Sequence, residues 1–173
     1  MSEQGRVVIV GAGHAGGTAA ALLRQYGYAG AITLIGEEPI APYQRPPLSK
    51  AWLKGEADAD SLLLKEAGWY AENDIELRLG VRTERIDRAA RTVVLEGGET
   101  VPYDALILAT GARARRLSVP GAELEGVLEL RSAADADKLK AALGPGKRLA
   151  GIGGGYVGLE AAASARALGA SVV

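Results

Sequence analysis

The 173-residue chain has no cysteine and only one histidine. Without thiols it cannot form a disulfide framework, a cysteine-ligated metal centre or a dithiol redox pair, and one histidine excludes a histidine-rich metal site. No apolar run reaches the roughly 18 residues needed to span a membrane, and the polar N-terminus lacks the apolar core of a secretory signal. We therefore expect a cytoplasmic protein with no metal site and no membrane partner.

A large excess of either charge is also missing. The chain has 20 Lys and Arg against 21 Asp and Glu, a net charge of −1. Such a balance argues against nucleic-acid binding through bulk charge. The abundant residue is glycine, with 24 copies, about twice ordinary usage. The glycines gather in two places, residues 11–17 and 151–158, rather than along a linker.

The first glycine cluster lies between a predicted strand and a predicted helix. Residues 6–10 form a short β-branched run that indicates a buried strand. An Ala- and Leu-rich helix is predicted over residues 15–26, and a second strand over 31–35. Together they predict a βαβ unit of about 30 residues.

Within this unit, Gly11, Gly13 and Gly16 form a G-x-G-x-x-G motif. The first glycine permits a tight turn, the second lets the backbone approach a pyrophosphate, and the third lets helix and strand pack closely. The N–H groups at the helix N-terminus suit the pyrophosphate. Glu37, after the second strand, is placed to bind a ribose hydroxyl. We interpret His14 as a tolerated loop residue rather than a proton carrier.

The remaining elements follow the same patterns of apolar runs and turn residues. Short helices are predicted at 48–53 and 61–71. A longer helix at 132–143 begins with Ser132 and Asp135, spaced as in a capping box, and another helix ends near 168. Strands are predicted at 75–79, 105–109, 127–130, 148–152 and 171–173, with an antiparallel meander at 81–87, 92–95 and 99–102.

A second G-x-G-x-x-G motif is formed by Gly153, Gly155 and Gly158, again after a strand and before a helix. The sequence stops three residues into the next strand. The residue that distinguishes NAD from NADP would lie beyond it, so we do not expect a complete second site here. We expect a fragment of a longer protein, or a chain that completes its sheet with another chain. Two motifs predict two dinucleotides, one flavin and one nicotinamide.

The order of the motifs resembles the two-dinucleotide flavoprotein reductases, in which the first motif holds FAD and the second NAD(P)H. The run 100–111 ends in Ala109, Thr110 and Gly111, similar to the second FAD signature of that group. The run 45–50, Arg-Pro-Pro-Leu-Ser-Lys, resembles the putidaredoxin reductase-like ferredoxin reductases that feed bacterial oxygenases. Apoptosis-inducing factor and rubredoxin reductases share parts of the pattern.

The resemblance implies an α/β Rossmann-like two-dinucleotide fold with a small antiparallel meander. It implies an FAD-binding domain at 1–112 and the truncated start of an NAD(P)-binding domain at 113–173. Electrons would pass from NAD(P)H through FAD to a ferredoxin, an iron–sulfur protein, that serves an oxygenase. Alternatives are an apoptosis-inducing-factor-like or rubredoxin-reductase-like flavoprotein, or an isolated chain that holds FAD without turnover.

The resemblance also implies roles for individual residues. Lys50 and Arg45 would approach the flavin, where the Lys50 cation would stabilise the anionic reduced ring. Thr83 would meet adenine through its backbone, and Glu160 would face the nicotinamide. Each could instead be an ordinary surface or strand residue. No certain catalytic acid or base is expected. The implied cofactor-binding residues are Gly11, Gly13, His14, Ala15, Gly16, Glu37, Arg45, Lys50, Thr83, Ala109, Thr110, Gly111, Arg131, Gly153, Gly155, Tyr156, Val157, Gly158 and Glu160.

Overall fold

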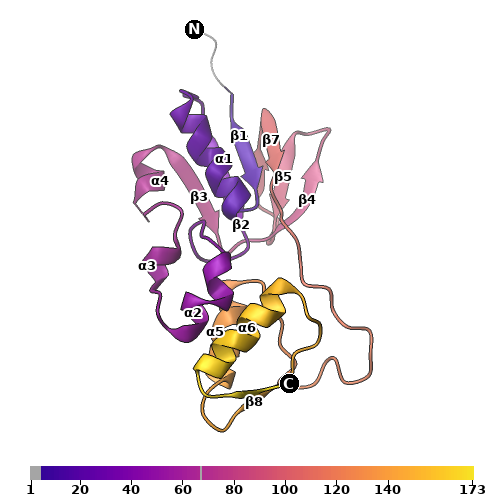
Figure 1. Ribbon diagram of the computed structural model, residues 1–173. Coiled ribbons are helices and arrows are strands. Elements are labelled where there is room, and N and C mark those ends of the chain that lie inside the picture. The colour runs from indigo at the N-terminus through magenta and orange to yellow at the C-terminus, as the bar shows by residue number, and fades with distance from the viewer. Residues whose placement is uncertain (1–4, 67) are drawn as a thin grey trace. The chain divides into compact units, whose positions relative to one another are not determined.

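The computed structural model describes residues 5–66 and 68–173 (Figure 1). Its contacts divide the chain into two compact units. Within the described ranges, the first unit runs to residue 44 and resumes at 63–111, and the second comprises 45–62 and 112–173. The predicted boundary at residue 112 separates cofactor domains rather than contact units, and it stays a prediction.

The first unit is built on a parallel sheet of four strands. The strand order is β3-β2-β1-β7, so the first strand lies in the interior of the sheet. Helix α1 (His14–Gln25) joins the parallel neighbours β1 and β2, which confirms the predicted βαβ unit. The strand bounds are β1 Val7–Val10, β2 Ile32–Gly36, β3 Ile75–Leu79 and β7 Ala105–Leu108.

Both faces of this sheet are covered, which explains why β1 is apolar at every position. Val7 and Ile9 face α1 and the short helix α4 (Trp69–Glu72). Val8 and Val10 pack against a meander of three antiparallel strands, as predicted. Each fully buried side chain of this size contributes roughly 1.5–3 kcal/mol. The meander strands are β4 Thr83–Asp87, β5 Thr92–Leu95 and β6 Thr100–Pro102.

The second unit is mainly helical around a small core of Leu53, Leu139 and Ala161. Two short parallel strands, β8 (Arg148–Leu149) and β9 (Ser171–Val172), flank its last helix in the sequence. The helices are the 3-10 turn η1 Pro46–Ser49, α2 Ala51–Lys54, α3 Ala59–Leu62, α5 Ala133–Ala142 and α6 Tyr156–Ala167.

Helix α5 begins with the predicted capping box. The Ser132 hydroxyl accepts a hydrogen bond from the Asp135 N–H at 3.2 Å, and the Asp135 carboxylate accepts one from the Ser132 N–H at 2.8 Å. Burial alone would raise the pKa of Asp135. Hydrogen bonds from Ser132 and the Arg131 backbone outweigh it and hold that pKa below its usual value. The prediction from two residues is therefore confirmed.

Two predicted elements are wrong. Residues 127–130 form no strand: no ladder partner pairs with them in the described chain, and Val127 is 49% exposed. The helix predicted at 61–71 does not form as one piece. Leu63 pairs with Tyr43 in a β-bridge, and the Leu64 N–H donates to the Pro42 carbonyl. These long-range backbone bonds replace the helical ones.

The helices described at 5–66 and 68–173 include none that is long and apolar enough to cross a membrane.

Candidate functional site

The predicted site residues fall into two groups, one in each unit. In the first unit, the turn between β1 and α1 is so tight that it has no room for a side chain at Gly11 or Gly16. Gly11 has a φ of +112°, and a Cβ on it would lie 2.1 Å from the Ala109 carbonyl oxygen. A Cβ on Gly16 would lie 1.9 Å from the Gly11 carbonyl oxygen. Glycine is required at both positions by this packing.

The carboxyl ends of three strands meet at this turn. The Gly11 N–H donates to the Ile35 carbonyl, and the Ala109 N–H donates to the Val10 carbonyl, both at 2.8 Å. A Cβ on Gly36 would lie 2.5 Å from the Ala12 side chain. The structure therefore brings the run that ends in Ala109 against the first glycine motif, although 98 residues separate Ala109 from Gly11 in the sequence.

The start of α1 has the features of an anion site. Gly13 is the N-cap residue, and within the described chain no side chain caps this helix and no acidic residue lies in its first turn. His14, interpreted from the sequence as a loop residue, is instead the first residue of α1, because the helix begins directly after the Gly13 cap. His14 and Ala15 are exposed. The unpaired N–H groups and the positive end of the helix dipole are therefore open to a phosphate group. The turn fits the pyrophosphate of a dinucleotide.

Two adjacent carboxylates follow β2, and the structure distinguishes them. Glu38 accepts a 2.6 Å hydrogen bond from the hydroxyl of the buried Tyr43. Glu37 is exposed, and among the described residues none forms a hydrogen bond or ion pair with its carboxylate. Glu37 is therefore the one of these two acids whose carboxylate is available to a ligand, and its predicted role toward a ribose stays a prediction.

Thr83 lies at the start of β4, close to the end of β2. The Val81 N–H donates to the Gly36 carbonyl at 3.1 Å, which holds the two segments together. The Thr83 hydroxyl oxygen is buried and has no hydrogen-bond partner among the described residues. An unpaired buried hydroxyl is costly, and a polar ligand edge at this position would satisfy it.

In the second unit, a hollow of about 310 Å³ gathers the charged residues predicted to lie near the flavin and nicotinamide. Its walls come from the 3-10 turn, the segment before α5 and the first turns of α6. The lining residues are Arg45, Pro46, Leu48, Ser49, Lys50, Leu130, Arg131, Val157 and Glu160. Three cations and one carboxylate therefore surround a partly apolar space.

The carboxylate of Glu160 is held by two donors. The Lys50 Nζ lies 2.7 Å from Glu160 Oε2, and the Ser49 hydroxyl donates to the same oxygen at 2.6 Å. The hydrogen bond from Lys50, followed by that from Ser49, lowers the pKa of the Glu160 carboxyl. Glu160 is thus ionised at neutral pH, and it orients the half-exposed Lys50 ammonium.

The two arginines of the hollow are also fixed. Arg45 Nη1 donates to the Arg131 carbonyl oxygen at 2.6 Å, and Arg131 Nε donates to the Ala112 carbonyl oxygen at 3.0 Å. The Arg131 backbone N–H in turn donates to Asp135 at 3.2 Å. The cap of α5 therefore positions Arg131, and Arg131 positions Arg45.

The second glycine motif forms a similar but more open turn. Gly153 has a φ of +98°, and Gly155 is the N-cap residue of α6. A Cβ on Gly158 would lie 3.2 Å from the Gly153 carbonyl oxygen, and one on Gly153 would meet nothing within 4 Å. Tyr156 is 89% exposed. The described chain thus supplies no third strand end to close this turn.

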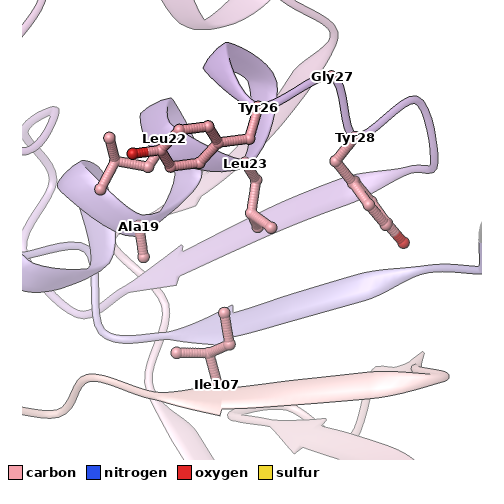
Figure 2. A pocket seen from close by; sticks show the side chains of 7 residues that line it. All are labelled: Ala19, Leu22, Leu23, Tyr26, Gly27, Tyr28 and Ile107. Atoms are coloured by element: carbon pink, nitrogen blue, oxygen red, sulfur yellow. The ribbon is translucent and has the colours of Figure 1, made fainter.

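A larger hollow, of about 450 Å³, lies beside α1 and β7 in the first unit (Figure 2). It is bordered by the C-terminal half of α1, away from the glycine turn. No charged side chain lines it, so it offers no cation to a phosphate and no carboxylate to a ribose. Its lining residues are Ala19, Leu22, Leu23, Tyr26, Gly27, Tyr28 and Ile107. Size alone does not make it the candidate site.

Sequence reasoning missed two contributors, Ser49 and Ser164. Ser49 lies within the run 45–50, but the sequence pattern predicted no role for it. Ser164 lies four residues after Glu160 on α6, and its hydroxyl donates to the Ser49 carbonyl oxygen at 2.7 Å. The i, i+4 spacing on a predicted helix was the available signal. Nothing in the sequence indicated that the partner would be Ser49.

A family model described as pyridine nucleotide-disulphide oxidoreductase matches residues 5–173. The chain is 51% identical over its whole length to a probable ferredoxin reductase, CtmF, of Castellaniella defragrans, and covers 42% of that protein. It is 46% identical to a rubredoxin-NAD(+) reductase of Pseudomonas putida, with 96% of the chain and 43% of that protein covered. The chain thus spans about two fifths of the length of these curated relatives.

A crystal structure of a covalent putidaredoxin reductase–putidaredoxin complex contains a chain with the same fold. The TM-score is 0.90 at 40% sequence identity, and the likeness covers 99% of this chain and 42% of that one. The α/β Rossmann-like fold predicted from the sequence is therefore confirmed.

Proposed function

Because the chain belongs to the pyridine nucleotide-disulphide oxidoreductase family, we propose that it forms part of an FAD-dependent ferredoxin reductase. The reductase takes electrons from NAD(P)H and delivers them to a ferredoxin that serves an oxygenase. The observation that carries the proposal is the turn at Gly11 and Gly16, closed by the Ala109 carbonyl. The proposal that the ferredoxin serves an oxygenase rests on the resemblance of residues 45–50 to the oxygenase-coupled reductases.

Bound FAD would accept a hydride from NAD(P)H and release electrons singly to an iron–sulfur carrier. In the first unit, the N-terminus of α1 binds the pyrophosphate through its free N–H groups. The exposed Glu37 carboxylate accepts hydrogen bonds from ribose hydroxyls. Together these groups hold the nucleotide end of the cofactor.

In the second unit, the resemblance gives Lys50 the role of a positive charge near a flavin ring, where it would stabilise the negative charge added by reduction. Glu160 holds the Lys50 ammonium at 2.7 Å, so the cation is oriented before the reaction begins. Arg45 and Arg131 add two further fixed cations. Hydride transfer needs no protein nucleophile, so these residues act through alignment and electrostatics.

The first test is the absorption spectrum of the purified chain, with and without added FAD, before and after anaerobic NADH. We expect a bound-flavin spectrum. The matched variants are Gly13→Val and Gly68→Val. Gly13 has an extended backbone (φ −84°, ψ −165°), a conformation open to valine, and a side chain there would block the pyrophosphate. Gly68 caps α4, and a Cβ there makes only an ordinary 3.6 Å contact.

The expected result is loss of flavin from the Gly13→Val variant and parental occupancy in the Gly68→Val variant. Parental occupancy in both variants contradicts the assignment of the first motif. Bleaching by NADH indicates that the chain is active as it stands. Bound flavin without bleaching indicates a binding fragment that does not turn over.

A second candidate is a rubredoxin reductase, favoured by the 46% identity to the Pseudomonas putida protein. The two candidates differ in the acceptor and not in the flavin chemistry. Rates of reduction of a [2Fe–2S] ferredoxin and of a rubredoxin by the full-length reductase distinguish them. The cytoplasmic location stays a prediction from the sequence.

A further inference from the structure

Ser49 is a buried hydroxyl at the end of the 3-10 turn, 4% exposed. Pro46 and Pro47 restrict the backbone before it, and the buried Leu48 anchors the turn beside it. Its position is therefore set before any ligand binds. A buried hydroxyl needs a partner, and the two acceptors in reach are unequal. Glu160 Oε2 is at 2.6 Å, whereas the Pro46 carbonyl oxygen is at 3.5 Å.

Helix α6 holds this residue at two points. Glu160 and Ser164 are four residues apart, which places them on one face of the helix. The Ser164 hydroxyl donates to the Ser49 carbonyl oxygen at 2.7 Å, and Ser164 is itself 5% exposed. The Glu160 carboxylate accepts from the Ser49 hydroxyl. The backbone and the side chain of one residue are thus bound to consecutive turns of α6.

Lys50 cannot fix the carboxylate alone. Its side chain is 49% exposed and has several rotatable bonds, and the other contact of its ammonium is a 3.3 Å hydrogen bond to the Pro46 carbonyl. The Ser49 hydroxyl is short, buried and clamped, so it defines where Glu160 Oε2 lies. Both donors meet on that oxygen, which leaves Oε1 without a partner among the described residues.

We propose that Ser49 is a positioning residue for Glu160: its backbone is held by Ser164, and its hydroxyl fixes the orientation of the Glu160 carboxylate beside Lys50. The inference depends on the proposed function in one respect only, the identity of the ligand that Glu160 would face. The other charged groups that line the hollow are Arg45 and Arg131. Both arginines favour the ionised form of Glu160 in the wild type and in every variant. Their effect on the Glu160 pKa therefore cancels when variants are compared with the wild type.

The test is an NMR titration of the side-chain carboxyl carbon of Glu160 in the full chain without cofactor. We expect the Ser49→Ala variant to raise the pKa of Glu160 above its wild-type value, because one of the two donors is lost. The Ser49→Thr variant keeps the hydroxyl and should restore the wild-type value. The Ser61→Ala variant is the matched control, since that exposed hydroxyl donates to the Asp58 carbonyl oxygen instead.

An unchanged Glu160 pKa in the Ser49→Ala variant, or no rescue by threonine, overturns the proposal. If the Ser49→Ala variant fails to fold, a second measurement on the wild-type chain still tests the proposal. The Ser49 Cβ resonance should follow the Glu160 titration with the same midpoint, and a resonance that stays constant through that titration overturns the proposal. No flavin is present in either experiment. Failure here therefore leaves the proposed function standing, and loss of the proposed function leaves this result unaffected.

Discussion

Replacing Gly16 by alanine is the sharpest test of the first glycine turn. The added Cβ would lie 1.9 Å from the Gly11 carbonyl oxygen, about 1.1 Å closer than the 3.0 Å limit of real Cβ contacts. The neighbour is backbone, pinned by the Gly11 N–H bond to Ile35, so it cannot rotate away. Overpacking lowers the free energy of unfolding by about 1–3 kcal/mol, occasionally more. Because the contact here is with fixed backbone, we expect a cost at the upper end of that range.

Alanine also favours a helix over glycine by about 1 kcal/mol. The net expectation for the Gly16→Ala variant is a loss of about 2 kcal/mol in the free energy of unfolding of the first unit. Gly158→Ala is the matched control at the equivalent place in α6. There the contact to the Gly153 carbonyl oxygen is 3.2 Å, so a shift of a few tenths of an ångström relieves it. We expect no loss, or a small gain, in that variant.

Urea unfolding followed by tryptophan fluorescence measures each unit separately. Trp69 packs on the core of the first unit, and Trp52 belongs to the second. Each variant is made in a background where the other tryptophan is phenylalanine. Equal changes in the Gly16→Ala and Gly158→Ala variants would refute the reasoning, because the two substitutions differ only in what the new methyl meets.

Two further predictions concern the cap of α5. The Ser132→Ala variant should lower the free energy of unfolding of the second unit by about 1 kcal/mol, while Ser132→Asp should retain most of it; urea titrations read by Trp52 fluorescence compare them. The pKa of Asp135 is lowered in the folded chain, so its contribution is present above the ordinary aspartate pKa of about 3.9 and is lost as the pH falls through the folded value. Unfolding titrations between pH 7 and pH 2 should therefore show a shallower acid loss for Asp135→Asn than for wild type, and parallel curves would contradict this.

The sequence by itself determined the elements whose cause is local. The β-branched run at 7–10 is apolar at every position, which predicts a buried strand. The spacing of Gly11, Gly13 and Gly16 identified a strand–turn–helix joint. Ser132 and Asp135 identified a helix start from two residues three apart. The two residues of the cap lie close together in the sequence, and the apolar run and the glycine spacing are themselves local patterns, so they can be read without the distant groups that later pack against them.

Tertiary structure decided what depends on distant partners. Residues 127–130 are apolar enough for a strand but found no ladder partner. Leu63 is not helical as predicted, because it forms a β-bridge with Tyr43, which lies 20 residues earlier in the sequence. Ser49 and Glu160 are 111 residues apart, and no spacing rule joins them. A hydrogen bond between such groups exists only after packing has placed both elements, which is why the clamp on Glu160 could not be read from the chain.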